Sequence, residues 1–236
     1  MEGGPKPMPR TPDEPTSSPG ERTSRRLAPL LPALLLLTAL AASHPLAAAS
    51  ASTVVYESDF SGNPDPSWGA KALLLTTSPS GERFLGRFGN TDATLAVAAP
   101  LPHSSLTLSF DLYIIETWDG QGGPYQSHAD EWTLTGPSGA TMVHTSFSNC
   151  DRESQDYPAP AGYGYSYSAT TGAAAVDTLG YDLICYYWEG VADSTYHFQV
   201  TVPHSLPHAT FTFAAAGLQE LEDESWGLDN VRVTAA

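Results

Sequence analysis

Carboxylate side chains near the two ends of the strand-forming part of the chain are the first candidates for chemistry. Glu57 and Asp59 lie in the strand-like segment 56–62, and Asp229 lies in the last such segment, 222–233. The first and last strands of a sandwich fold meet, so we expect these carboxylates to come together. Carboxylates held together there must be protonated, hydrated apart or bridged by a cation. We therefore predict that Glu57, Asp59 and Asp229 hold a structural calcium ion.

Aromatic side chains offer a second kind of chemistry, because a flat apolar ring with a polar edge can stack on a sugar ring. They gather on and beside a long segment between the two cysteines of the chain. Loops of more than about 15 residues inside a compact domain are usually functional or mobile. The sequence therefore predicts a ligand-binding platform that consists of Tyr163, Tyr165, Tyr167, Tyr187 and Trp188.

No residue pattern in the sequence specifies a reaction. The histidines lack the H-E-x-x-H motif of zinc sites, and no G-x-S-x-G motif marks a serine nucleophile. Asp130 and Glu131 are adjacent, so in a strand they point to opposite faces and cannot flank one glycosidic bond as a pair about 5 Å apart. The acidic, glycine-rich turn 119–123 fits a second cation or a solvated hairpin tip equally well. We predict a protein that is not an enzyme.

Apolar and polar residues alternate with a period of two, which is typical of half-buried strands. The clearest case is 106–114, and no stretch after residue 52 shows a sustained helical period. Breaks of Gly, Pro, Ser and Asn separate the strands at the spacing of a sandwich or jelly roll. We predict an all-β fold, an antiparallel β-sandwich of jelly-roll type, concanavalin-A-like or galactose-binding-like. Further strands are predicted at 70–76, 93–98, 132–135, 142–147, 181–188, 196–202, 210–215 and 226–233.

An internal echo links 94–114 with 196–215, since each reads as a strand, a Leu-Pro-His connector and a second strand. We interpret it as one hairpin used twice, by duplication or by convergence on a common connector. An acidic turn with a tryptophan follows each copy, at 116–120 and 224–227. These turns are interpreted as matching corners of two facing sheets.

Residues 1–52 have the features of a secretory signal with a polar extension before it. A Pro-rich start containing Arg25 and Arg26 is followed by the apolar stretch 27–42 and then by small residues. The apolar stretch is short for a membrane span of about 20 residues, and it contains prolines. We expect cleavage near 49–52, export by a route left open, no transmembrane span in the mature chain, and one domain over 53–236.

The mature chain is strongly acidic. Five Lys and Arg stand against 22 Asp and Glu after residue 52, a net charge of −17. Such a field repels nucleic acid and anionic membranes and attracts cations. Cys150 and Cys185 are its two cysteines, and an even pair in an exported protein indicates a disulfide, which would contribute roughly 3 to 4 kcal/mol.

Short motifs at both ends resemble a known class of fold. Ser58-Asp59-Phe60-Ser61-Gly62 and 228–233 are similar to the first and last strands of laminarinase-type, concanavalin-A-like jelly rolls. Carbohydrate-binding jelly rolls and MAM-type adhesion domains share that layout. The resemblance implies a calcium ion between Asp59 and Asp229, with Glu57 as an auxiliary ligand. The E-x-D-x-x-E run of the glucanases is absent, and the middle of the chain resembles uncharacterised exported bacterial sandwich proteins.

Taken together, these features indicate a secreted, calcium-stabilised, non-catalytic module that binds carbohydrate or a cell-surface glycan. A surface adhesion or structural module that binds protein is the alternative, and a divergent glycan hydrolase is a lesser one. Sugar identity and oligomeric state are not specified by the sequence.

Overall fold

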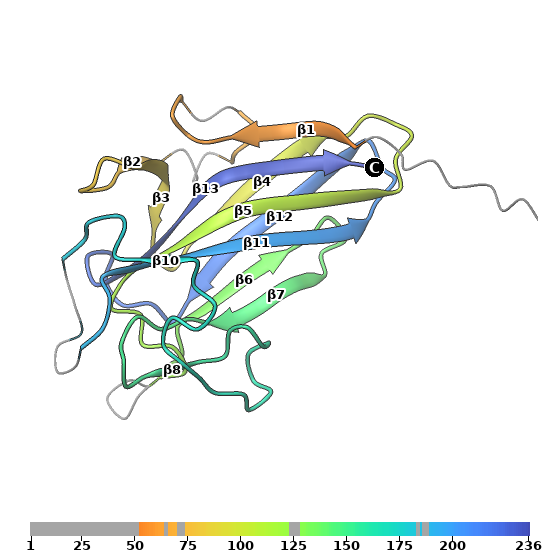
Figure 1. The fold of residues 1–236 in the computed structure, drawn as a ribbon. Coiled ribbons are helices and arrows are strands. Elements are labelled where there is room, and N and C mark those ends of the chain that lie inside the picture. The colour runs from red at the N-terminus through yellow and green to blue at the C-terminus, as the bar shows by residue number, and fades with distance from the viewer. Residues whose placement is uncertain (1–51, 64–65, 70–73, 123–127, 183–184, 186–188) are drawn as a thin grey trace, which may run out of the picture. The chain divides into compact units, whose positions relative to one another are not determined.

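The computed structural model describes residues 52–63, 66–69, 74–122, 128–182, 185 and 189–236 (Figure 1). The signal segment therefore lies outside the described residues, apart from Ser52. No helix long and apolar enough to cross a membrane occurs in the described part. The strands are β1 (Thr53–Ser58), β2 (Leu75–Thr77), β3 (Arg83–Phe88), β4 (Asp92–Ala98), β5 (Ser105–Glu116), β6 (Glu131–Thr135), β7 (Thr141–Ser146), β8 (Ser154–Gln155), β9 (Tyr167–Ser168), β10 (Ala175–Val176), β11 (Asp193–Pro203), β12 (His208–Ala216) and β13 (Glu224–Ala235).

The strands form two antiparallel sheets and one short pair. The larger sheet has the order β10-β11-β5-β13-β3-β2, with β1 also paired to β13. The smaller sheet has the order β4-β12-β6-β7, and β8 pairs with β9. The two sheets face each other across one apolar core, so the predicted antiparallel β-sandwich of jelly-roll type is confirmed.

Aromatic rings from both sheets fill the core. Trp132 of β6 lies 5.8 Å from Phe110 of β5 and 6.3 Å from Trp226 of β13, between ring centroids. These distances are typical of favourable edge and tilted contacts between aromatic rings. The alternation predicted along 106–114 is confirmed, because every second residue from Leu106 to Ile114 is buried in this core.

Strand β13 joins the parts of the larger sheet. One of its edges pairs with β5 from Glu224 to Ala235. The other edge pairs with β3 over 226–228 and with β1 over 231–235. The change of partner falls beside an irregularity in the register between Asp229 and Arg232. The first and last strands therefore lie side by side, as the sequence predicts.

The internal echo is real, but its interpretation as a repeated hairpin is wrong. Strand β4 lies in the smaller sheet and β5 in the larger one, while β11 lies in the larger sheet and β12 in the smaller one. Each copy is thus an arch that crosses between the sheets, and the arches stack because β4 pairs with β12 and β5 with β11. Their connectors touch where His103 Nε2 lies 2.9 Å from His204 Nδ1.

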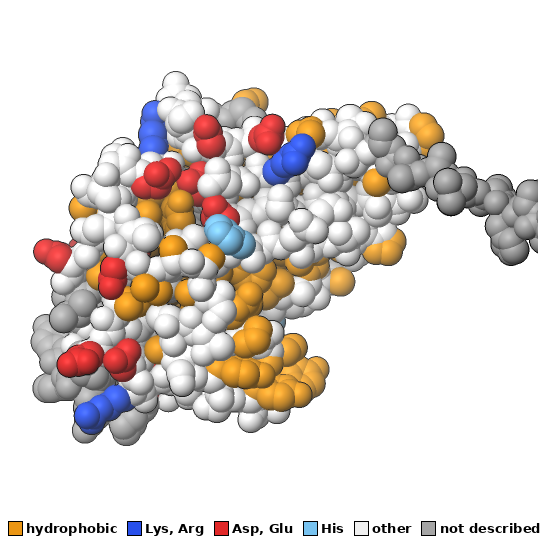
Figure 2. All heavy atoms as spheres, viewed as in Figure 1, with side chains coloured by type: hydrophobic (Ala, Val, Ile, Leu, Met, Phe, Trp, Pro, Cys, Tyr) orange, Lys and Arg blue, Asp and Glu red, His pale blue; other side chains and the backbone are white. Residues whose placement is uncertain are grey.

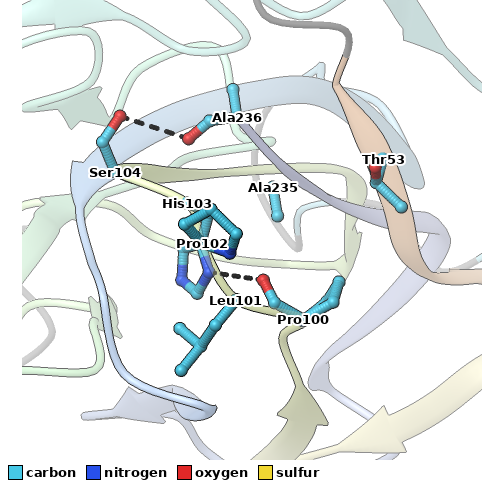
Figure 3. A pocket seen from close by; sticks show the side chains of 8 residues that line it. All are labelled: Thr53, Pro100, Leu101, Pro102, His103, Ser104, Ala235 and Ala236. Atoms are coloured by element: carbon cyan, nitrogen blue, oxygen red, sulfur yellow. Dashed lines mark hydrogen bonds between the residues drawn. The ribbon is translucent and has the colours of Figure 1, made fainter.

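The first of these connectors lines a hollow of about 470 Å³ beside the last residues of the chain (Figure 3). His103 Nδ1 lies 2.8 Å from the carbonyl oxygen of Pro100, which fixes the ring within its own connector. Ser104 donates a hydrogen bond to the carbonyl oxygen of Ala236.

Three further predictions about the elements need correction. Glu116 and Glu224 lie opposite each other on β5 and β13 of one sheet, so the acidic turns are not corners of two facing sheets. Strand β3 was not predicted because its sequence does not alternate: Phe84, Leu85 and Gly86 follow one another and are all buried. The strand predicted at 181–188 is wrong where it is described, since Tyr181, Asp182 and Cys185 lie outside any strand.

The predicted disulfide is present between Cys150 and Cys185, which are 35 positions apart. Cys150 is buried in the segment that follows β7, and its backbone forms an isolated antiparallel β-bridge with Gly190. The bond therefore ties both ends of the tyrosine-rich segment to one point of the sandwich.

Replacing both cysteines with serine should lower the free energy of unfolding by about 3 to 4 kcal/mol, because a loop of this length loses its closure in the unfolded state. Chemical denaturation of the oxidised wild type and of the Cys150→Ser, Cys185→Ser protein measures the difference. The reduced wild type serves as the matched control and should behave as the variant does. Equal stability of oxidised and reduced wild type would contradict the structural role.

Candidate functional site

An apolar groove lies where the sandwich opens between two sheet edges. Beyond Thr195, β11 has β5 as its one strand partner among the described residues, and β7 ends the smaller sheet. Between these edges the side chains of Phe198 and Val200 reach the surface of a hollow of about 560 Å³. Figure 2 shows hydrophobic side chains gathered on this side of the molecule, below β11.

The segment that follows β8 forms the outer wall of the groove. Ala161 donates its backbone N–H to the carbonyl oxygen of His144 at 2.8 Å, and Thr145 donates its hydroxyl to the carbonyl oxygen of Ala159 at 2.8 Å. This segment therefore covers part of the edge of β7 and is fixed to it. The groove is lined by Thr141, Met142, Val143, His144, Thr145, Tyr157, Pro158, Ala159, Pro160, Ala161, Tyr163, Phe198 and Val200.

Tyr163, one of the tyrosines of the predicted platform, lines this groove. Its side chain is 75% exposed, and it sits between Gly162 and Gly164, whose positive φ angles make a tight surface turn. A tyrosine ring that is left this exposed contributes little to the core and is free to contact a ligand.

Tyr165 and Tyr167 stack on each other, with ring centroids 6.3 Å apart and ring planes 19° from parallel. Tyr165 is half exposed, and its carbonyl oxygen accepts a hydrogen bond from the side chain of Gln121. These two tyrosines do not line the groove that Tyr163 lines. Tyr187 and Trp188 lie outside the described residues.

The three predicted calcium ligands have separate partners in the structure. Asp59 is exposed and accepts hydrogen bonds from the backbone and hydroxyl of Ser61 at 3.0 and 2.7 Å. Glu57 Oε1 lies 3.4 Å from Arg232 Nε, and both side chains are largely exposed. Asp229 is buried and accepts a hydrogen bond from the hydroxyl of Tyr113 at 3.0 Å. Among the described residues, these three do not form a group whose ligand atoms all lie within 4.8 Å of one another.

Burial dominates the electrostatics of the Asp229 carboxyl. Removal from water disfavours its ionised form and raises its pKa to about 6, and the hydrogen bonds from Asn230 and Tyr113 oppose that shift. The same burial raises the pKa of the Tyr113 hydroxyl, and the charge of Asp229 adds to that effect. Asp229 is thus a buried acid with one hydroxyl donor.

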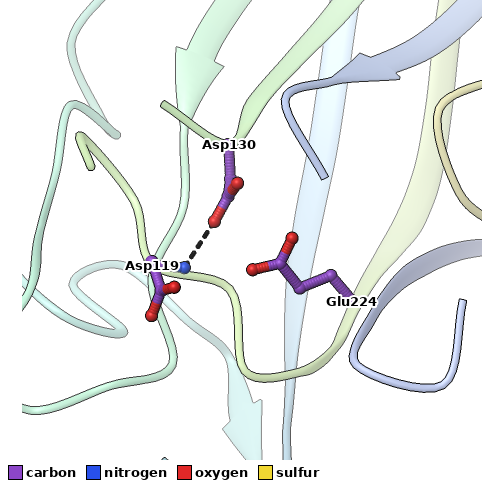
Figure 4. A group of neighbouring side chains, drawn as sticks. All are labelled: Asp119, Asp130 and Glu224. Atoms are coloured by element: carbon purple, nitrogen blue, oxygen red, sulfur yellow. Dashed lines mark hydrogen bonds between the residues drawn. The ribbon is translucent and has the colours of Figure 1, made fainter. Parts of the chain in front are cut away.

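A different set of carboxylates meets the geometric requirement for a metal. Asp119, Asp130 and Glu224 each offer an oxygen, and these oxygens lie within 4.8 Å of one another (Figure 4). The sequence relates the acidic turn that contains Asp119 to the turn that begins at Glu224, but it predicts them at corners of two facing sheets and does not predict that their carboxylates meet. The sequence signal for this cluster is the pair of acidic turns, each beside a tryptophan. The pairing of their strands, β5 and β13, in one sheet brings the turns together.

The groove was missed because its residues look like ordinary core residues. Phe198 and Val200 continue the alternation of β11, and only the short length of β10 leaves them beside an open edge. Pro158 and Pro160 are the sequence signal for the outer wall of the groove. Prolines have no backbone N–H to donate, so two of them close together indicate a segment without regular strand pairing.

Comparisons with known proteins give distant structural likenesses. No protein-family model matches the chain, and no curated protein matches it. The chain is similar to a carbohydrate-binding module of Cellvibrio mixtus lichenase 5A solved with cellotriose, at 14% identity over 78% of this chain and 99% of that one, with a TM-score of 0.31. It is also similar to the K3 cleaved adhesin domain of Lys-gingipain from Porphyromonas gingivalis, at 15% identity over 78% and 99%, with a TM-score of 0.36.

A third likeness is to the C-terminal module of a marine laminarinase from Zobellia galactanivorans, at 9% identity over 78% of this chain and 99% of that one, with a TM-score of 0.32. At these TM-scores the likeness is distant. The fold described above rests on the strand pairing of this chain alone.

The raised pKa of Asp229 predicts a pH dependence of stability. Because the folded pKa of about 6 lies above the ordinary value of 3.8, the folded state holds the proton more tightly. The free energy of unfolding should then fall as pH rises from about 4 to about 6. Asp229→Asn should reduce this slope when urea unfolding is measured in EDTA, and the remainder comes from other buried or partly buried carboxyls such as Asp119, whose pKa is also raised to about 6.

Glu57→Gln is the control for that experiment, because it removes a carboxylate whose side chain is exposed. It should leave the slope unchanged. An equal slope in wild type and in Asp229→Asn would show that the burial of Asp229 has no such consequence. Calcium bound at Asp229 would favour the ionised form and move the window to lower pH.

Proposed function

We propose that the domain is an exported, non-catalytic module that binds carbohydrate in the groove beside Tyr163. The observation that carries the proposal is this ring, which is 75% exposed at the rim of a groove of about 560 Å³. Ligand sites of small molecules have volumes of about 300 to 1,000 Å³ and combine apolar walls with a few polar groups. The sugar ring would stack on Tyr163 and extend along the groove.

Polar groups at the same groove supply hydrogen bonds for sugar hydroxyls. Thr141 lies at the exposed start of β7 and lines the groove, so its hydroxyl is accessible to a ligand. His144 Nε2 lies 2.9 Å from Glu131 Oε2, so the imidazole is held in place while its other nitrogen is left for a ligand. An aromatic face with neighbouring polar groups is the chemistry that sugar recognition requires.

The positions of the carboxylates support a binding role rather than hydrolysis. Asp130 and Glu224 are close together but fully buried, so a polysaccharide cannot reach them. Glu131, the neighbour of Asp130, points elsewhere and pairs with His144. A glycosidase needs an acid and a second carboxylate on the two sides of the scissile bond.

A protein segment is the second candidate ligand. The groove runs beside the outer edge of β11, where backbone groups beyond Thr195 have no second strand partner among the described residues. An extended peptide could add there as a strand, with its side chains on Met142 and Val143. This would make the domain an adhesion module.

Export and calcium remain parts of the proposal. The arginine-containing start, the apolar stretch and the small residues of 1–52 support export, and a disulfide such as Cys150–Cys185 persists in oxidising compartments. A calcium ion at Glu57, Asp59 and Asp229 would need rearrangement of the contacts that these side chains make with Arg232, Ser61 and Tyr113.

Tyr163→Ala should weaken glycan binding roughly fivefold or more, because truncating a central aromatic contact typically costs more than about 1 kcal/mol. The melting temperature should stay nearly unchanged, since the side chain is 75% exposed. A glycan array on residues 53–236 identifies a ligand, and calorimetry on wild type and variant measures the affinity.

Leu206→Ala is the matched control, because Leu206 is also exposed, at 64%, and does not line the groove. It should bind as the wild type does. Absence of binding to every glycan on the array, together with binding of an unstructured peptide that Val143→Arg abolishes, would reject the carbohydrate proposal in favour of the adhesion module.

A further inference from the structure

Three carboxylates from separate parts of the chain meet at one end of the sandwich. Asp119 lies after β5, Asp130 lies directly before β6, and Glu224 is the first residue of β13. Strands β5 and β13 belong to the larger sheet and β6 to the smaller one. Figure 4 shows the Glu224 carboxylate directed toward the other two side chains. The cluster therefore spans the two sheets.

Burial makes this cluster costly. Asp130 and Glu224 have no exposed surface, and Asp119 is partly buried. The removal from water raises the pKa of Asp130 to about 8 and that of Glu224 to about 9. Negative neighbours add to this, since Asp119 acts on Asp130, and Asp130 acts on Glu224. Buried carboxylates need a proton, a donor or a cation to be stable.

Protein donors satisfy only part of the cluster. Asp130 Oδ2 accepts a hydrogen bond from the backbone N–H of Asp119, and Glu224 Oε2 accepts one from the backbone N–H of Gln219. The remaining oxygen of Asp130, Oδ1, is buried and has no hydrogen-bond partner among the described residues. Buried polar atoms are nearly always paired, so a fully buried carboxylate oxygen that is left over calls for a ligand.

The side chain of Gln219 supplies a fourth group. Its Nε2 lies 3.3 Å from Glu224 Oε1 and 3.4 Å from Asp119 Oδ2. The nitrogen and oxygen of an amide occupy equivalent positions, and the neighbouring groups determine which of them points inward. With a cation between the carboxylates, the amide would turn so that Oε1 becomes a ligand. Gln219 is exposed, so water can reach that side of the cluster.

The donor set consists of oxygen atoms, which hard cations prefer, and it contains none of the imidazole or thiolate ligands that favour zinc or copper. Calcium binds oxygens at about 2.3 to 2.6 Å, so oxygens on opposite sides of the ion are about 5 Å apart. The 4.8 Å limit within which the three ligand atoms lie is compatible with that shell. Bidentate carboxylates, Gln219 and water can complete six to eight ligands.

We propose that Asp119, Asp130 and Glu224, with the amide of Gln219, form a binding site for a hard divalent cation, calcium in the first instance. The site goes beyond the proposed carbohydrate function and differs from the strand-end site of Asp59 and Asp229. Its ion holds the segment before β13 against the segment between β5 and β6.

The backbone around the site is already arranged for such a link. Thr117 donates its N–H to the carbonyl oxygen of Asp223 at 2.9 Å, and Asp130 donates its N–H to the carbonyl oxygen of Gly120 at 2.8 Å. A Cβ placed on Gly217 would lie 2.0 Å from the carbonyl oxygen of Ala129, so the two segments pack backbone against backbone. The carboxylates are therefore held in position by both segments.

The test uses residues 53–236 after removal of metal, with calcium chloride as the probe. Calorimetry should show one calcium ion bound per chain, and thermal unfolding should show a higher melting temperature with calcium than with EDTA. At a free concentration of 100 times the dissociation constant, the unfolding equilibrium constant should fall about a hundredfold. Magnesium should give a smaller shift, because it loses its water shell reluctantly.

Glu224→Gln and Asp130→Asn keep the shape of each side chain and remove one charge. Each should abolish the calcium response, and in EDTA each should be at least as stable as the wild type because a buried amide, unlike a buried carboxyl, cannot ionise. Glu222→Gln is the matched control, an exposed glutamate of the same segment, and it should respond to calcium as the wild type does. Terbium luminescence excited through tryptophan, such as the buried Trp118 beside Asp119, gives a readout that does not depend on stability.

Three results would overturn the proposal. One is identical melting curves and no binding heat with calcium, which would mean that protons alone neutralise the cluster. Another is an unchanged calcium response in Glu224→Gln together with a lost response in Asp59→Asn, which would place the ion at the strand ends. A larger shift with magnesium than with calcium would overturn the choice of calcium. Glycan binding is measured separately, so its failure does not affect these outcomes.

Discussion

The pairing of β13 with β5 is the interaction on which the rest of the structure depends. It runs from Glu224 to Ala235, and β1, β3 and β11 pair directly with these two strands, while β2 and β10 attach through β3 and β11. Its inner face carries Trp226, Leu228 and Phe110 into the core, where the rings of the smaller sheet meet them. Because β13 is the last strand, this contact joins residues more than a hundred positions apart. Such contacts form late and only when the chain has closed a long loop.

The same pairing determines what each end of the sandwich can do. At one end it brings Glu224 opposite Glu116, and the segments that leave these residues carry the buried carboxylates. Away from that end, β11 continues along β5 with no further strand of the described residues on its outer side, and the groove opens there. The proposed sugar site and the proposed cation site thus use different parts of the molecule, and neither contributes a residue to the other.

Local pattern predicted the strands well because alternation is a property of neighbouring residues. The strand from Leu106 to Ile114 is recognisable because one of its faces is apolar. The disulfide is predictable from the number of cysteines and the expected compartment. Assembly was harder to predict. The Leu-Pro-His echo predicted two similar connectors correctly, but their crossing between sheets depends on which strands pair, and that is decided by contacts far apart in sequence.

The site residues show the same limit more sharply. Asp130 and Glu224 are separated by more than ninety positions, and nothing near either one announces the other. The sequence predicts that Asp59 and Asp229 meet because the first and last strands pair. The strands do pair, but Asp59 follows the end of β1 and is exposed, whereas Asp229 is buried against Tyr113. Strand pairing fixes the backbone register, whereas the direction of each side chain follows from the alternation and from local irregularities such as the one after Asp229.

The close approach at Gly217 has a consequence for how the sequence can vary. Residue 217 lies in an exposed turn, where substitutions are usually harmless, but a methyl group there would have to occupy the place of the Ala129 carbonyl oxygen. Gly120 has the same close approach in a buried turn, with the carbonyl oxygen of Ser154 at 2.2 Å from the position of a Cβ. Two turn positions, one of them exposed, are therefore as intolerant of substitution as the centre of the core. A collection of functional variants of this domain would keep glycine at both while the neighbouring exposed residues diverge.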